Sequence, residues 1–204
     1  MTDQALWLKT STIATMFGAV ILLAHQLKRK FSFSRRVELA FALKPWRELH
    51  DLDCLLDAMK DGSIAANTLQ IPYPYTRQDA EWYLNMAKDL KLSWFIDVNG
   101  KFGGAIGFHE VEGPGRNHIY MLGYYLAPQF RGMGLMTSVL DRAIEQFKRE
   151  LPNIQYLEAN IFAHNNQSGR VLEKNGFVSS NVLKFFYSKN GQVIDAVRYV
   201  RKLY

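Results

Sequence analysis

The predicted elements of this chain indicate an α/β fold, with a mixed antiparallel and parallel sheet flanked by helices. The first observation is their order: a strand, two helices, three strands, a helix, a strand, a helix and two strands. The second is a pair of Asn-Gly dipeptides, at 99–100 and 190–191, each typical of a tight hairpin turn. The third is a strand, glycine loop and helix over residues 120–150, around which the rest of the chain is organised.

The first half of the chain supplies one strand and two helices. An apolar run over 37–44 predicts a strand, and helical spacing of apolar residues predicts a helix over 49–59. After a proline-rich loop, Thr76 is placed to cap a second helix. We expect the apolar side of that helix to contain Trp82, Leu84, Met86, Ala87 and Leu90.

The second half supplies two hairpins and two further helices. Strands are predicted over 93–98 and 101–110, and the second is rich in glycine, which permits close backbone approach. Helical spacing predicts a helix from about 135 to 149. The remaining predicted elements are a turn over 111–117, strands over 120–126, 156–162, 182–189 and 193–201, and a short helix over 167–175.

Length, charge and cysteine content narrow the class of protein. A chain of 204 residues suits one domain with one good core. The net charge is +6, but the basic tract over 28–36 contributes +5 of it and leaves residues 37–204 at about +1. This distribution argues against a nucleic-acid partner. The single cysteine, Cys54, excludes an internal disulfide, suits a reducing compartment, and lies in an apolar run as a small core residue.

Residues 1–36 differ in composition from the rest and are predicted to form a separate hydrophobic helix with a basic tract. The stretch over 6–27 is long enough to cross a bilayer. The basic tract after it would mark the cytoplasmic side, so we expect a cytoplasmic domain tethered to the membrane. Two alternatives remain open: a helix packed on protein, or a removed leader, although a leader normally carries its positive charge before the apolar core.

The loop Gln129–Gly134 has the features of an anion site. It joins a strand to a helix, and its two glycines allow the backbone to approach a ligand closely. Free N–H groups and the helix dipole favour a phosphate there, and Arg131 adds a full positive charge. No Gly-Lys-Ser/Thr follows, and position 137 is Thr where a dinucleotide fingerprint needs a third glycine. A pyrophosphate-bearing ligand of another kind is therefore indicated.

Four segments together resemble the GNAT superfamily of N-acetyltransferases, in the subfamily of ribosomal-protein alanine and serine N-acetyltransferases. The loop is similar to the superfamily's Gln/Arg-x-x-Gly-x-Gly/Ala motif. The resemblance covers about residues 37–204 and implies the N-acetyltransferase fold over that range. The other matching segments are IPYPYT with DAEW over 71–82, LGYYLAP over 122–128 and NNQSGRVLEKNGF over 165–177.

The resemblance implies acetyl-CoA as the acetyl donor. Its pyrophosphate would occupy the loop, and its pantetheine arm would lie where the strands over 120–126 and 156–162 separate. The cofactor-binding residues implied in this way are Tyr124, Leu126, Gln129, Phe130, Arg131, Gly132, Met133, Gly134, Leu135, Asn165 and Ser168.

The expected reaction is direct transfer of the acetyl group to an amine: a protein N-terminus, a lysine or a small molecule. Ser168 is the candidate donor to the leaving thiolate, although a serine at a helix start is often a cap. The identity of the general base is not assigned, because relatives carry a Glu at the position where this chain has Met121. The candidates are Glu110, His109 and Tyr187, while we expect Glu158 to form a structural ion pair.

Two further expectations concern the acceptor and the class of function. Tyr73, Tyr75 and Trp82 are expected to wall the amine site, with an aromatic core as the alternative. The alternative function is a non-catalytic acyl-CoA-binding module that has kept the cofactor loop and lost the base. The sequence does not fix the oligomeric state.

Overall fold

The computed structural model describes residues 39–111 and 119–204. The chain divides into two compact units, Met1–Glu38 and Leu39–Tyr204. The helix predicted over 6–27, most of the turn predicted over 111–117, and His118 lie outside the described residues. Among the described helices, none has the length and apolar character needed to cross a membrane.

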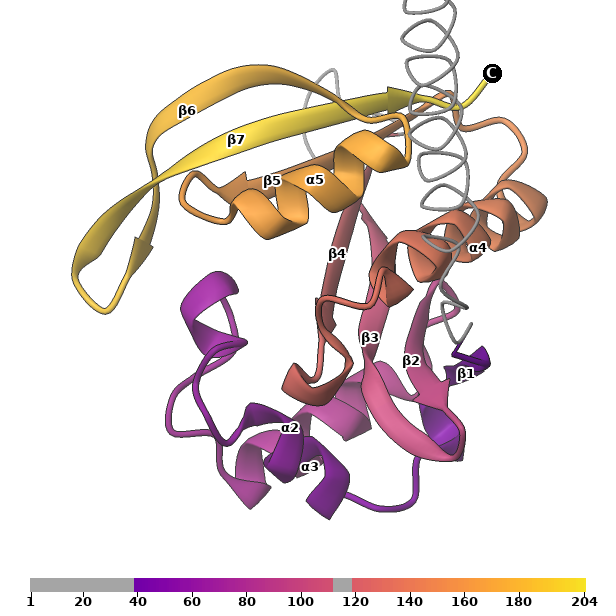
Figure 1. Cartoon of the computed structure of the whole chain (residues 1–204), viewed down its shortest axis with the longest axis vertical. Helices are drawn as coiled ribbons and strands as arrows, with labels where there is room; N and C mark the ends of the chain where they lie inside the picture. The colour runs from indigo at the N-terminus through magenta and orange to yellow at the C-terminus, as the bar shows by residue number, and fades with distance from the viewer. Residues whose placement is uncertain (1–38, 112–118) are drawn as a thin grey trace, which may run out of the picture. The chain divides into compact units, whose positions relative to one another are not determined.

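A seven-stranded sheet forms the centre of the second unit (Figure 1). Its strand order is β1-β2-β3-β4-β5-β7-β6, and every neighbouring pair is antiparallel except β4 and β5. The predicted mixed sheet is therefore confirmed. The strands are β1 Phe41–Pro45, β2 Ser93–Val98, β3 Lys101–Glu110, β4 Tyr120–Leu126, β5 Tyr156–Phe162, β6 Val178–Lys189 and β7 Gln192–Lys202.

Helices cover the sheet on two faces, and each face has its own core. The longest helix, α4, contributes seven buried residues to the larger core, which it shares with α5 and with alternate residues of β2 to β5. The smaller core forms around the buried Trp46, where α2 and α3 pack against Phe95 and Ala105. The helices are α2 Asp53–Met59, α3 Arg77–Ala87, α4 Leu135–Glu150 and α5 Asn166–Lys174.

Two predicted helices differ from those observed. The helix predicted over 49–59 begins only at Asp53, where the Asp51 carboxylate accepts the Asp53 N–H and residues 49–52 are not helical. In α3 the predicted apolar side is wrong for Trp82, which is 65% exposed, and for Met86, which is also exposed. Leu90 is exposed too and lies beyond the end of the helix at Ala87. The residues of α3 that pack inward are Ala80, Tyr83, Leu84 and Ala87.

Candidate active site

The two parallel strands part soon after they begin to pair. Only Tyr120 and Met121 of β4 are paired with β5, opposite Leu157 and Glu158. Beyond Glu158 the two strands diverge, as Figure 1 shows. The sheet is therefore open between β4 and β5 along the rest of both strands.

Backbone polar groups of both strands face this opening. The hydrogen bond from Ala127 N–H to Gly103 O (2.9 Å) fixes which β4 residues bond to β3. Because bonded and non-bonded positions alternate in an antiparallel pair, the backbone N–H and C=O groups of Leu122, Tyr124 and Leu126 point toward the opening. In the same way, the hydrogen bond from Ala163 N–H to Asp195 O (2.9 Å) fixes which β5 residues direct their backbone groups toward β7 and which direct them toward the opening.

The loop after β4 leads directly into α4. Gly132 and Gly134 have φ values of 75° and 79°, in the left-handed region that glycine adopts most readily. Gly134 is the N-cap of α4 and has no side chain to satisfy the first N–H groups. A Cβ added at Gly132 would meet no atom within 4 Å, so the space beside it is open. Unpaired N–H groups and open space together suit an anion.

Arg131 holds the loop against its surroundings. Its Nε donates to Leu126 O at 3.1 Å, and its Nη1 donates to Ser63 Oγ at 2.7 Å. The guanidinium therefore connects the end of β4, the loop and the segment after α2. Its charge also contributes positive potential beside the N-terminus of α4.

The first turn of α5 is positioned by two backbone contacts of Ser168. Asn165 is the N-cap, and its Oδ1 accepts the Ser168 N–H at 3.2 Å. The Tyr124 hydroxyl donates to Ser168 O at 3.0 Å and thereby connects α5 to β4 across the opening. Ser168 is thus not the cap of its helix, and neither contact uses its hydroxyl.

A groove of about 1050 Å³ follows the opening between β4 and β5. The predicted residues that line it are Tyr124, Leu126, Phe130, Arg131, Gly132, Gly134, Leu135, Asn165, Ser168 and Tyr187. Three predicted residues lie elsewhere. Gln129 is exposed, Met133 is 55% exposed, and Glu110 is an exposed strand end whose carboxylate accepts the Tyr120 hydroxyl at 3.5 Å.

Among the other base candidates, His109 and Tyr187 reach the groove. His109 lies beside Met121 in the sheet register, and desolvation lowers the pKa of its ring. Its imidazole is therefore neutral near pH 7 and can accept a proton. Tyr187 packs edge-on against Phe162, with ring centroids 5.7 Å apart.

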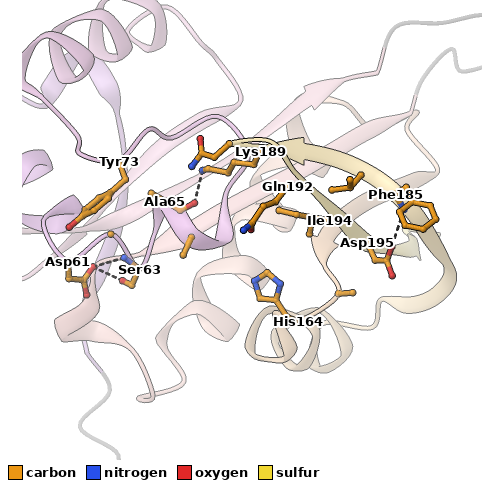
Figure 2. A pocket seen from close by; sticks show the side chains of 15 residues that line it. Asp61, Ser63, Ala65, Tyr73, His164, Phe185, Lys189, Gln192, Ile194 and Asp195 are labelled. Carbon is orange, nitrogen blue, oxygen red and sulfur yellow. Dashed lines mark hydrogen bonds between the residues drawn. The ribbon is translucent and has the colours of Figure 1, made fainter.

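A second hollow, of about 940 Å³, lies next to the groove and shares Ser63 with it. Figure 2 shows Tyr73, Asp61 and Ser63 on one side and residues of the β6–β7 hairpin on the other, with His164 below the hairpin residue Gln192 in this view. Lys189 of the hairpin donates to the carbonyls of Ala65, Thr68 and Ile71 at 2.7, 2.5 and 2.9 Å.

The three aromatic residues expected around the amine have different positions. Tyr73 lines the second hollow and is 61% exposed. Tyr75 packs against the smaller core, and burial raises the pKa of its hydroxyl to about 12. Trp82 lines neither space and is exposed, so its expected position at the amine site stays a prediction without support from these two cavities.

Comparison with protein families assigns the chain. The model described as "Acetyltransferase (GNAT) domain" matches residues 41–178, more than half of the sequence. The chain belongs to this family. The GNAT resemblance of the loop and of the three other segments is thereby confirmed.

Curated relatives and solved structures agree with the family. The L-amino acid N-acetyltransferase AaaT of Escherichia coli is 22% identical over 150 residues, which cover 73% of this chain and 90% of that protein. The [ribosomal protein uS5]-alanine N-acetyltransferase of Escherichia coli is 34% identical over 83 residues, covering 41% and 42%. RimL, a ribosomal L7/L12 alpha-N-protein acetyltransferase solved with coenzyme A, superposes with a TM-score of 0.65 at 17% identity, covering 79% and 93%.

Sequence patterns missed several residues of the site. Ser63, Asn160 and Lys189 gave no local signal, because each acquires its place through strands or loops distant in sequence. Lys189 lies 118 to 124 residues from the carbonyls that it contacts. Register prediction across β4 and β5 is the one approach that would have placed Asn160 beside the opening.

Proposed function

We propose that this chain transfers an acetyl group from acetyl-CoA to a primary amine. The observation that carries the proposal is the opening between β4 and β5 next to an uncapped helix N-terminus. One end offers backbone groups to an extended amide-bearing arm, and the other offers N–H groups to a pyrophosphate. Acetyl-CoA contains both parts and the thioester to be cleaved.

Nine of the predicted cofactor residues would bind the donor. The loop backbone at Gly132 and Gly134 would take the pyrophosphate, with Arg131 supplying charge from beside it. The backbone of Tyr124 and Leu126 would pair with the pantetheine arm, as the open β4 edge favours. The other proposed contacts, which also line the groove, are Phe130, Leu135, Asn165 and Ser168.

Ser168 is the proposed donor to the departing sulfur. Its hydroxyl is not used by the contacts that fix its backbone, and the residue lines the groove. A hydroxyl can donate to a developing thiolate and relay a proton to it. Tyr187, which reaches the same groove from the hairpin, is retained as a candidate on the acceptor side.

The acceptor would enter through the second hollow, because it opens beside the groove. The relatives named above act on an L-amino acid and on a ribosomal-protein alanine, so both kinds of amine belong in the test. We would incubate the full chain with acetyl-CoA and an alanine-starting peptide, a lysine peptide or free L-amino acids. Free thiol and an acetylated product in one mixture support the proposal, and thiol release without product from any amine contradicts it.

The alternative of a non-catalytic acyl-CoA-binding module rests on Met121, which leaves β4 without a carboxylate next to the opening. It predicts binding of acetyl-CoA without thiol release for every amine. The assay above separates the two functions when a calorimetric titration with acetyl-CoA is run in parallel.

Attachment to the cytoplasmic face of a membrane through residues 6–27 is a further proposal, made from sequence alone. Fractionation of cells that express the full chain or residues 37–204 tests it. Recovery of only the full chain with membranes supports the tether, and recovery of both chains without detergent contradicts it.

A further inference from the structure

Three buried polar side-chain atoms without hydrogen-bond partners lie on β5, which borders the opening, and on β7, the next strand beyond it. Among the described residues, Glu158 Oε2, Asn160 Oδ1 and Arg198 Nε are the buried side-chain atoms left unpaired. Asn160 and Arg198 are register partners, and Glu158 lies two residues earlier on the same face of β5. An unpaired buried polar group is destabilising, so such a cluster needs an explanation.

The position of the cluster points to a ligand. Glu158 is the last β5 residue paired with β4, opposite Met121. Two residues further along each strand, β4 presents Gly123 and β5 presents Asn160, which lines the groove. A Cβ added at Gly123 would meet no atom within 4 Å, so the space beside Gly123, on the β4 side of the opening, is empty.

We propose that Asn160 and Glu158 form the subsite for the acceptor amine. Asn160 Oδ1 would accept a hydrogen bond from the amine, and the Glu158 carboxylate would take its proton. Glu158 Oε2 and Asn160 Oδ1 are both acceptors, whereas an ammonium group offers donors only. Glu158 on β5 thus supplies the carboxylate that is missing from β4, where this chain has Met121. This inference rests on the proposed function and assigns its missing base.

The ion pair with Arg198 does not account for the cluster. Glu158 Oε2 and Arg198 Nε are 3.7 Å apart, which fits the structural ion pair expected from the sequence, yet neither atom makes a hydrogen bond. Asn160 Oδ1 takes no part in that pair. Among the described residues, Arg198 on β7 forms the ion pair with Glu158, and His109 is two strands away on β3, at the register position of Met121.

The chemical step balances with the groups named. One proton of the acceptor ammonium moves to the Glu158 carboxylate, which leaves a neutral amine with a free electron pair. That pair attacks the carbonyl carbon of the acetyl thioester and forms a C–N bond. When the tetrahedral intermediate collapses, the C–S bond breaks and a second amine proton moves to the departing thiolate. Glu158 then returns its proton to solvent.

Two acceptors that differ in their need for a base test this role. At pH 8 ethylamine is protonated and must lose a proton, whereas hydroxylamine is already neutral. We expect Glu158→Gln to lower kcat/KM by about 10²-fold with ethylamine and by less than about threefold with hydroxylamine. The ratio of the kcat/KM values for the two acceptors does not depend on the fraction of the variant that is folded. Glu145→Gln, in an exposed pair with Lys148, is the matched control. Equal losses with both acceptors, or no loss, would overturn the assignment.

A binding experiment keeps the inference separate from the proposed function. If wild-type chain acetylates neither amine, CoA-bound chain is titrated with ethylammonium chloride while the Asn160 side-chain amide is followed by NMR. We expect its signals to shift with ethylammonium, to shift less in Glu158→Gln, and to stay unchanged with tetramethylammonium, which has no N–H donor. No shift with ethylammonium, or the same shift with both cations, would overturn the subsite.

Discussion

Ser168 illustrates how the backbone can position a side chain for chemistry without using it. Asn165 accepts its N–H, and Tyr124 donates to its carbonyl. Burial raises the pKa of the Tyr124 hydroxyl well above its usual value, so Tyr124 remains a neutral donor at any working pH. The sequence indicated Ser168 as a candidate, but it could not show that Asn165 performs the capping that a serine at this position often performs.

Replacing Ser168 by alanine tests its proposed role. We expect Ser168→Ala to lower kcat by about 10²-fold, because the leaving thiolate would lose its donor. The KM for acetyl-CoA and the melting temperature should change little, since Asn165 still caps α5. Steady-state kinetics and thermal denaturation measure these effects, with the exposed helical residue Ser138 changed to alanine as control. A kcat within threefold of wild type would exclude the role.

At the scale of elements, local chemistry predicted the turns and caps well. Asn99 and Asn190, in the two Asn-Gly turns, have φ values of 52° and 51°, as tight hairpin turns require. Thr76 caps α3 in a reciprocal arrangement with Asp79. The predicted apolar side of α3 failed because helical spacing favours large residues, whereas the face toward the core uses Ala80 and Ala87 to bring the helix close.

The cap of α3 yields a prediction about stability and pH. We expect Thr76→Ala to lower the free energy of unfolding by about 1 kcal/mol at pH 7, measured by urea denaturation. Hydrogen bonds from the Thr76 side chain and backbone lower the pKa of Asp79. Stabilisation by that carboxylate is therefore complete above its ordinary pKa and is lost as the pH falls through the lowered value.

The difference between Thr76→Ala and wild type should accordingly shrink at acidic pH. Gln78→Ala, an exposed change in the same turn, is the control. A loss from Thr76→Ala that matches the control would show that the cap contributes nothing.

At the scale of the whole domain, two cations hold the segment between α2 and α3 from different sides. Arg131, in the loop before α4, donates to Ser63. Lys189, in the β6–β7 hairpin, donates to Ala65, Thr68 and Ile71. Periodicity and motifs could place each element, but they carry no information about contacts between residues more than sixty positions apart. This explains why the sequence predicted the loop before α4 but not the contacts that Arg131 and Lys189 make with the segment between α2 and α3.

Removing the Lys189 ammonium should loosen this segment. We expect Lys189→Met to lower the free energy of unfolding by roughly 2 kcal/mol, because three carbonyls lose a charged donor. Amide hydrogen exchange over residues 62–71 should rise more than elsewhere. Lys202→Met, an exposed lysine at the end of β7, is the control. Unchanged exchange over 62–71 would show that the hairpin does not hold the segment.

Calorimetric titration of the full chain with acetyl-CoA tests the central claim, that the loop before α4 and the opening behind it bind this donor. The informative comparison is Gly132→Ala against Gly100→Ala. Both glycines have a left-handed φ, of 75° and 79°, and both have open space around an added Cβ, so the backbone cost of about 1–2 kcal/mol is matched.

Only Gly132 lines the groove, whereas Gly100 lies in the β2–β3 turn. The proposed site predicts that wild type and Gly100→Ala bind acetyl-CoA equally and that Gly132→Ala binds at least about tenfold more weakly, a difference of about 1.4 kcal/mol. No heat with wild-type chain, or equal affinities for the two variants, would contradict it.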